Sequence, residues 1–88
     1  MDKYIQELEK EFPIGSLISP VSCRRLWLYR VLSRPNDKPW FDENTAGIVL
    51  GFVKSHAYYY RLHLYYRREH YTTAAFYYRT LEDLFRHV

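Results

Sequence analysis

The residues best suited to chemistry lie between Ala57 and Arg68, in the stretch AYYYRLHLYYRR, which alternates with a period of two. Because successive side chains of a β-strand point to opposite faces, the stretch predicts a strand with two different faces. One predicted face is apolar and carries Tyr58, Tyr60, Leu62, Leu64 and Tyr66. The other carries rings and cations, namely Tyr59, Arg61, His63, Tyr65 and Arg67. Tyrosines stack on bases and arginines neutralise phosphates, so the second face predicts a surface for single-stranded nucleic acid.

Three further cations extend this predicted surface: Lys54, Arg68 and Arg79. Two alternatives remain open. Tyrosine and arginine are also enriched in the hot spots of protein interfaces, so the same face suits a protein partner. In the third interpretation Tyr59 and Tyr65 only pair with neighbouring strands, while the arginines stay solvated.

A second candidate site is the aromatic pair Trp40 and Phe41, in the non-periodic segment 33–46, SRPNDKPWFDENTA. A loop of this length in a compact domain is usually functional or mobile. The pair either folds back as an apolar plug or stays exposed as an anchor for a partner. The flanking acids Asp37, Asp42 and Glu43 disfavour phosphates, so an exposed loop would favour a protein partner.

Histidines and the cysteine offer weaker candidates. His56, His63 and His70 are spaced seven residues apart, which would align them on a helix. On strands an odd spacing alternates faces, and a turn predicted at 69–73 separates His70 further. Cys23 is the only cysteine, and no motif places a base beside it. The chain also lacks phosphate-binding and nucleophile motifs. We therefore expect no metal, no cofactor and no enzymatic activity.

Composition and charge favour one small folded domain spanning 1–88. Hydrophobic residues make up 48% of the chain and ten residues are tyrosine, which suits a small, dense core. The net charge is +3, and the basic excess lies in the strand-rich part, where segment 45–81 holds five cations and one acid. A single cysteine and the lack of a predicted leader or membrane span favour the cytoplasm, or the host cytoplasm for a viral protein, with no membrane partner.

The elements that must position these residues follow from local patterns. Helical spacing of Tyr4, Ile5, Leu8 and Phe12 predicts an N-terminal helix over 1–12, capped by Asp2 and ended by Pro13. Besides the tyrosine-rich strand, alternation and β-branched residues predict strands at 16–19, 25–32, 47–53 and 74–79. Gly51 predicts a bulge, and Thr80 is expected to cap a helical turn over 80–85.

Five short strands and tight turns predict an α+β, mainly β, domain with a small closed barrel over 13–88. Three segments resemble the Src-homology-3-like barrels, including KOW-type modules: Ile14-Gly15-Ser16-Leu17-Ile18, Gly47-Ile48-Val49-Leu50-Gly51-Phe52, and Leu81-Glu82-Asp83-Leu84. Their order is also similar to that in short barrel proteins of tailed bacteriophages. The tryptophan usual in the penultimate strand is replaced by Phe76, Tyr77 and Tyr78, so no ligand site is carried over.

The resemblance implies a non-catalytic binding module. From the residues we expect nucleic-acid binding through the tyrosine and arginine face. The alternative of similar weight is a phage-type modulator or inhibitor that binds a host protein. A weaker alternative is a virion structural or self-assembling subunit, since tyrosines and unpaired strand edges suit homo-oligomers.

Overall fold

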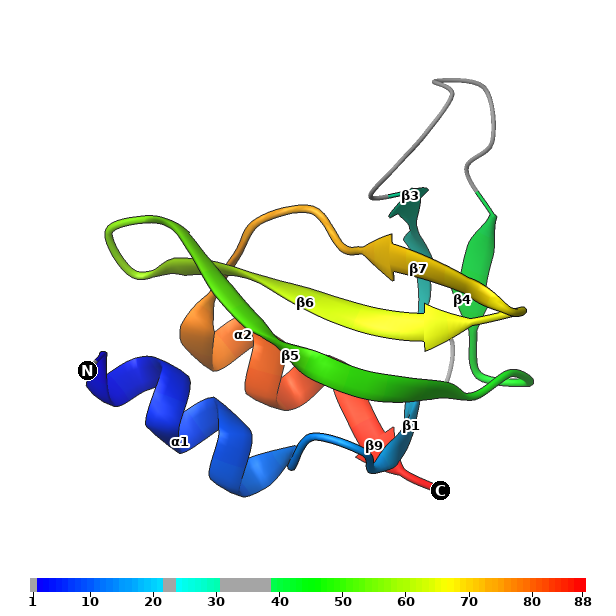
Figure 1. Cartoon of the computed structure of the whole chain (residues 1–88), viewed down its shortest axis with the longest axis horizontal. Helices are drawn as coiled ribbons and strands as arrows, with labels where there is room; N and C mark the ends of the chain where they lie inside the picture. The colour runs from blue at the N-terminus through cyan, green and yellow to red at the C-terminus, as the bar shows by residue number, and fades with distance from the viewer. Residues whose placement is uncertain (1, 22–23, 31–38) are drawn as a thin grey trace.

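The computed structural model describes residues 2–21, 24–30 and 39–88. In chain order they form α1 (Lys3–Glu11), β1 (Leu17–Pro20), β2 (Arg25–Trp27), β3 (Tyr29–Arg30), β4 (Trp40–Asp42), β5 (Gly47–His56), β6 (Tyr59–Tyr66), β7 (Glu69–Thr72), β8 (Phe76–Tyr77), α2 (Tyr78–Leu84) and β9 (Phe85–His87). The fold is α+β and mainly β, which confirms the predicted class (Figure 1).

The sheet is antiparallel and open. Its strands follow the order β3-β7-β6-β5-β1-β9, and β8 pairs with β6 beside this path. β2 and β4 form a separate two-stranded sheet. Among the residues described, the terminal strands β3 and β9 do not pair with each other, so closure into a five-stranded barrel is not confirmed.

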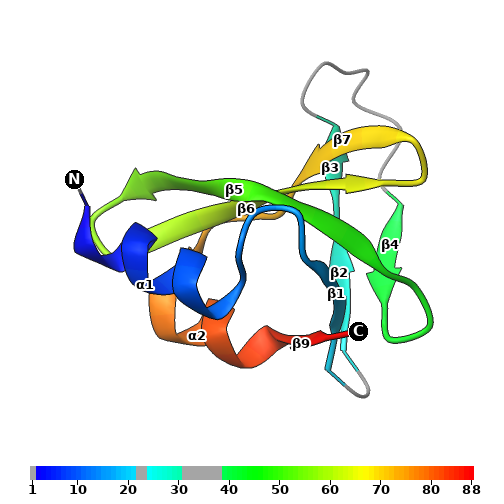
Figure 2. The ribbon, with the colours of Figure 1, turned by 60° about the horizontal axis from the view of Figure 1, so that its bottom comes forward.

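The centre of the sheet is β6, and its alternation is the predicted one. Tyr60, Leu62, Leu64 and Tyr66 are buried, while the residues between them are exposed or half-buried. Both helices lie on the same side of β5 and β6 (Figures 1 and 2). They cover the face that carries the buried residues. Tyr58 departs from the prediction, because it lies in the β5–β6 turn with a φ of 64° and is 52% exposed.

Helix α1 forms for the predicted reasons. Leu8 of the helix and Phe12 at its C-cap are buried at helical spacing and belong to the core, and Ile5 packs partly buried against it. The Asp2 side chain caps the helix by accepting hydrogen bonds from the backbone N–H groups of Tyr4 (2.8 Å) and Ile5 (3.4 Å). A helix of nine residues is marginal in water alone, so its packing on the sheet maintains it.

The core is one cluster of buried residues that come from the helices and from both sheets. Its buried members are Leu8, Phe12, Ile18, Leu26, Leu28, Phe41, Val49, Phe52, Tyr60, Leu62, Leu64, Tyr66, Tyr71, Leu81, Leu84 and Phe85. Gly51 produces the predicted bulge: the β5–β6 register shifts between Val49 and Gly51, and Gly51 has a φ of 149°.

The strand predicted over 25–32 is wrong as a single element. β2 pairs with β4 and β3 pairs with β7, so the segment is divided between two sheets at Leu28. There the Leu28 N–H donates to the Pro39 carbonyl (3.1 Å). β4 also lies in the segment predicted as a loop. Residues 31–38, which include the end of the predicted strand and the first part of the predicted loop, lie outside the described residues. Cys23 also lies outside them.

The predicted boundaries after β6 are also wrong. The turn expected at 69–73 is strand β7, and the actual turn is Arg67-Arg68, with φ values of 50° and 65°. Of the strand expected over 74–79, only the two residues of β8 are extended. Helix α2 begins at Tyr78, without a side-chain cap, rather than at Thr80. Cross-strand pairing and packing decided these short elements, which have little periodicity of their own.

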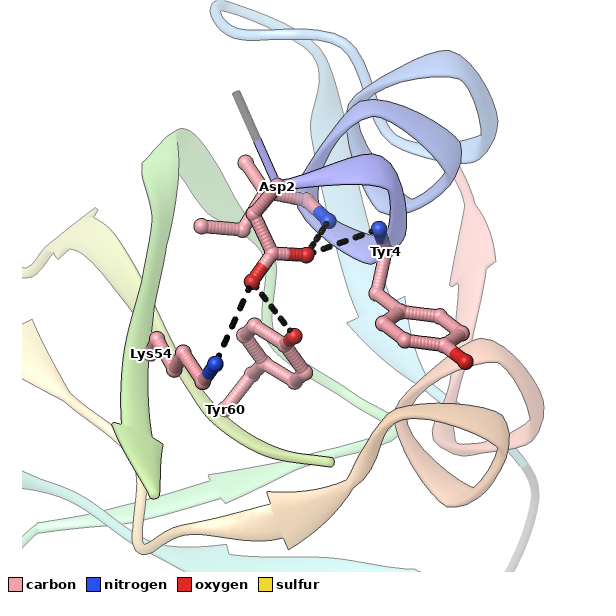
Figure 3. Close-up of polar contacts among 5 residues, drawn as sticks. Asp2, Tyr4, Lys54 and Tyr60 are labelled. Atoms are coloured by element: carbon pink, nitrogen blue, oxygen red, sulfur yellow. Dashed lines mark hydrogen bonds and ion pairs between the residues drawn. The ribbon is translucent and has the colours of Figure 1, made fainter. Parts of the chain in front are cut away.

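A polar contact between Asp2 and Tyr60 ties the start of α1 to the sheet (Figure 3). The Tyr60 hydroxyl donates to Asp2 Oδ2 (2.8 Å), and Lys54 Nζ lies 3.9 Å from the same oxygen. The hydrogen bond from Tyr60 is the main cause of a lowered pKa for Asp2. Burial, followed by the bond to Asp2, raises the pKa of Tyr60 from 10.0 to about 12.

This contact predicts a dependence of stability on alkaline pH. Because the folded pKa of Tyr60 is raised, its contribution is complete below pH 10 and is lost as the pH rises through about 12. We expect Tyr60→Phe to lower the free energy of unfolding by about 1–2 kcal/mol at pH 7. The difference in unfolding free energy between the wild type and Tyr60→Phe should disappear between pH 10 and 12, as measured by urea unfolding across that range. A difference that stays constant up to pH 12 would contradict the assignment.

At acid pH the stability contributed by Asp2 depends on pH in the opposite direction. Its lowered pKa means that its contribution is present above the ordinary value of 3.8 and is lost as the pH falls through the lower folded value. Urea unfolding at acid pH should therefore show that the free energy of unfolding falls below pH 3.8, and that it falls less in Tyr60→Phe than in the wild type.

Neither helix in the described part of the chain is long and apolar enough to cross a membrane.

Candidate functional site

The candidate site is the sheet face turned away from the helices, which we call the outer face. It is centred on Tyr59, Arg61, His63 and Tyr65 of β6. Tyr59 is 39% exposed and Tyr65 is 43% exposed, whereas Arg61 and His63 are half-buried. The structure thus brings together four of the five residues predicted for this face, as strand alternation requires.

Rings from neighbouring strands enlarge one end of the outer face. His56 of β5 stacks on Tyr59, with ring centroids 4.6 Å apart and an interplanar angle of 14°. Tyr77 of β8 contacts Tyr59 edge to face at 5.9 Å. Both pairings follow from the register, in which His56 and Tyr77 lie opposite Tyr59 on its two sides. The sequence pattern did not assign either residue to this face, because the pairing that places them is not local.

The middle of the outer face combines a cation with apolar surface. Arg61 lies opposite the exposed Val53 of β5. One terminal nitrogen of its guanidinium donates to the Thr73 carbonyl (3.3 Å). The arginine is therefore oriented at the surface rather than fully solvated.

Three of the predicted cations lie elsewhere. Lys54 pairs with Tyr60 on the helix side and faces Asp2. Arg79 lies in the first turn of α2, where its Nε donates to the Tyr78 hydroxyl (3.2 Å). Arg67 lies past the end of β6, with its guanidinium 5.1 Å from the ring centre of Tyr66. Of these, only Arg67 follows directly on β6, in the turn to β7, and the ring that its guanidinium contacts belongs to the buried face.

The charges of the two sides differ. Five of the ten acids are in the helices: Glu7, Glu9, Glu11, Glu82 and Asp83. On β6 the outer face presents Arg61, and Arg67 and Arg68 follow at its end. A polyanion would therefore meet less repulsion on the outer face than on the helical side.

No family model matches the chain, and no similar curated protein or solved structure was found.

The two residues of the second predicted site, Trp40 and Phe41, lie on opposite faces of β4. Phe41 is fully buried in the core, so it is not available to a partner. Trp40, its neighbour on β4, points outward and is 37% exposed. It stacks on Trp27 of β2 with centroids 3.6 Å apart, and Arg25 lies 5.0 Å from its ring centre. Trp27 is 45% exposed, so the two indoles form an accessible apolar patch.

The histidines differ from their prediction. Although their spacing of seven is odd, His63 and His70 meet on the outer face, with His63 Nδ1 3.2 Å from His70 Nε2. Sequence reasoning missed this pair because it assigned His70 to a turn. Across the described ranges, no three His, Cys, Asp or Glu side chains converge as a metal site.

Proposed function

We propose that this protein is a non-catalytic module that binds single-stranded nucleic acid on its outer face. The observation that carries the proposal is a sheet surface on which Tyr59 and Tyr65 are exposed beside Arg61, opposite the layer formed by the two acidic helices. Tyr59 and Tyr65 would stack on two bases, and Arg61 and the Arg67-Arg68 turn would contact phosphates. Ring stacking tolerates any base, so binding would be insensitive to sequence.

The test is fluorescence anisotropy with labelled oligo(dT) and oligo(U) across a salt series. Three arginine–phosphate contacts predict a log–log slope of about −2, at roughly −0.7 per phosphate on a single strand. Each lost stacking interaction costs about 1–3 kcal/mol, so Tyr59→Ala with Tyr65→Ala should weaken binding by about 30-fold or more.

Tyr58→Ala is the matched control. Tyr58 is 52% exposed, but its ring packs against Tyr4 of α1, away from the outer face. Its replacement should leave the affinity unchanged. No binding of either oligonucleotide at low salt, or equal losses in the control and the double variant, would overturn the proposal.

A second candidate function is binding to a protein, as expected of a phage-type modulator of a host protein. The stacked pair Trp27 and Trp40, with Arg25 above it, favours this candidate, because tryptophan and arginine dominate interface hot spots. Pull-down from nuclease-treated lysate separates the candidates. Partners that survive nuclease and are lost in Trp27→Ala with Trp40→Ala would support a protein partner, whereas loss of all partners on nuclease treatment would support nucleic acid.

Self-assembly as a virion subunit stays a third and weaker proposal, and sedimentation that gives only monomer at high concentration would exclude it. The Src-homology-3-like barrel is likewise a proposal. An experimental structure that shows pairing between the two ends of the sheet would support it.

A further inference from the structure

His63 and His70 face each other across the β6–β7 hairpin. In the register His63 lies opposite Thr72, and His70 lies opposite Tyr65, so the two histidines are diagonal neighbours on the outer face. Their rings lie nearly perpendicular, at 68°, and His63 Nδ1 is 3.2 Å from His70 Nε2. The backbone pairing of two strands, rather than a flexible loop, sets this separation.

The distance between the two nitrogens suits a shared metal ion. Zinc binds imidazole nitrogen at about 2.0–2.1 Å, and two such bonds at a tetrahedral angle place the nitrogens about 3.3 Å apart. The observed 3.2 Å is close to this value. Without a metal, the same distance is a hydrogen bond in which one ring donates and the other accepts.

The surroundings leave room for an ion and its water. The two histidines line a hollow of about 300 Å³ that runs from the outer face to α1, and Glu9 of α1, Gly51 and Val53 are also in its lining. Gly51 lies opposite His63 and has no side chain to fill the space between them. Glu9 also contributes a carboxylate to the lining.

The protonation state also suits a ligand. Burial is the main cause of a lowered pKa for His63, followed by the charges of His70 and Arg61. A lowered pKa favours the neutral imidazole, which is the form that binds a metal. For both facing nitrogens to coordinate, the proton of His63 must lie on Nε2 and that of His70 on Nδ1.

We propose that His63 and His70 form a two-histidine site for a divalent transition metal of the zinc class. Water or a partner's side chain would complete the coordination shell, since the described residues supply no cluster of three ligands. This site goes beyond the proposed nucleic-acid binding and does not rest on it. Its consequence would be a metal bridge between β6 and β7 at the centre of the outer face.

The experiment is titration of the full chain with Zn²⁺ at pH 7, followed by calorimetry and by histidine ring signals in NMR. We expect one ion per chain and shifts in the signals of His63 and His70. Loss of even an outer-shell partner costs a metal site about 10–100-fold, so His63→Gln or His70→Gln should weaken binding by at least about tenfold. Zn²⁺ should also raise the unfolding temperature of the wild type but not of these variants.

His56→Gln is the control, because His56 is an exposed histidine of the same face that stacks on Tyr59 instead of facing another histidine. It should bind Zn²⁺ as the wild type does. The proposal is overturned by the absence of Zn²⁺ binding to the wild type, or by binding that persists unchanged in His63→Gln and His70→Gln. The NMR readout on the wild type decides the question even for a variant that does not fold.

Discussion

Leu64→Ala is expected to lower the free energy of unfolding by about 3–5 kcal/mol. Leu64 is fully buried on β6, the central strand, between Val49 of β5 and Tyr71 of β7. Its truncation would leave a cavity that three paired strands have little freedom to close. Domains of this size are stable by only about 4–13 kcal/mol, so the variant should approach the unfolding threshold at 37 °C.

Urea unfolding followed by intrinsic fluorescence measures this loss, and Leu50→Ala is its matched control. Leu50 lies on β5 and is 39% exposed, so its truncation removes little buried area. We expect a change below about 0.5 kcal/mol for the control. A loss below about 1 kcal/mol for Leu64→Ala would show that β6 does not form the centre of the core.

Gly47→Val is expected to cost about 2–3 kcal/mol through overpacking. A Cβ at this position would lie 2.7 Å from Leu64 Cδ1 and 3.4 Å from both Phe41 Cζ and the Tyr65 carbonyl oxygen. Leu64 and Phe41 are both fully buried, so neither ring nor methyl can move aside without displacing other core residues. Gly47 is therefore required for close packing rather than for a special backbone angle.

A double-mutant cycle gives this prediction its sharpest form. Leu64→Ala removes the atom that a valine at position 47 would strike, so Gly47→Val should cost less in that background than in the wild type. Equal costs in the two backgrounds, measured by urea unfolding, would exclude a steric clash with Leu64.

The parts of the fold that could be predicted are those with a long or capped pattern. β6 alternates over eight residues, and α1 combines helical spacing with a cap and a following proline. In both elements the periodicity of the sequence alone assigns each residue to the buried or the exposed face. The bulge at Gly51 was also predictable, because a glycine inside a strand pattern usually marks a bulge or a close approach of the backbone.

The candidate site was predictable only along one strand. Alternation placed Tyr59, Arg61, His63 and Tyr65 on one face, but it also assigned Arg67 there, and Arg67 lies in the turn. Lys54 was included for its charge, yet the pairing of β5 with β6 turns it toward Asp2. Partners such as His56 and Tyr77 come from strands whose register is not encoded locally.

By itself, the sequence determined the mainly β composition, the N-terminal helix and the two-sided character of β6, because these depend on periods that neighbouring residues carry. Only the tertiary structure decided that 69–72 is a strand, that 25–30 is divided between two sheets, and that Phe41 is buried beside an exposed Trp40. It also decided that His63 meets His70. Segments of two to four residues have too little pattern to specify their state, so the strands they pair with specify it for them.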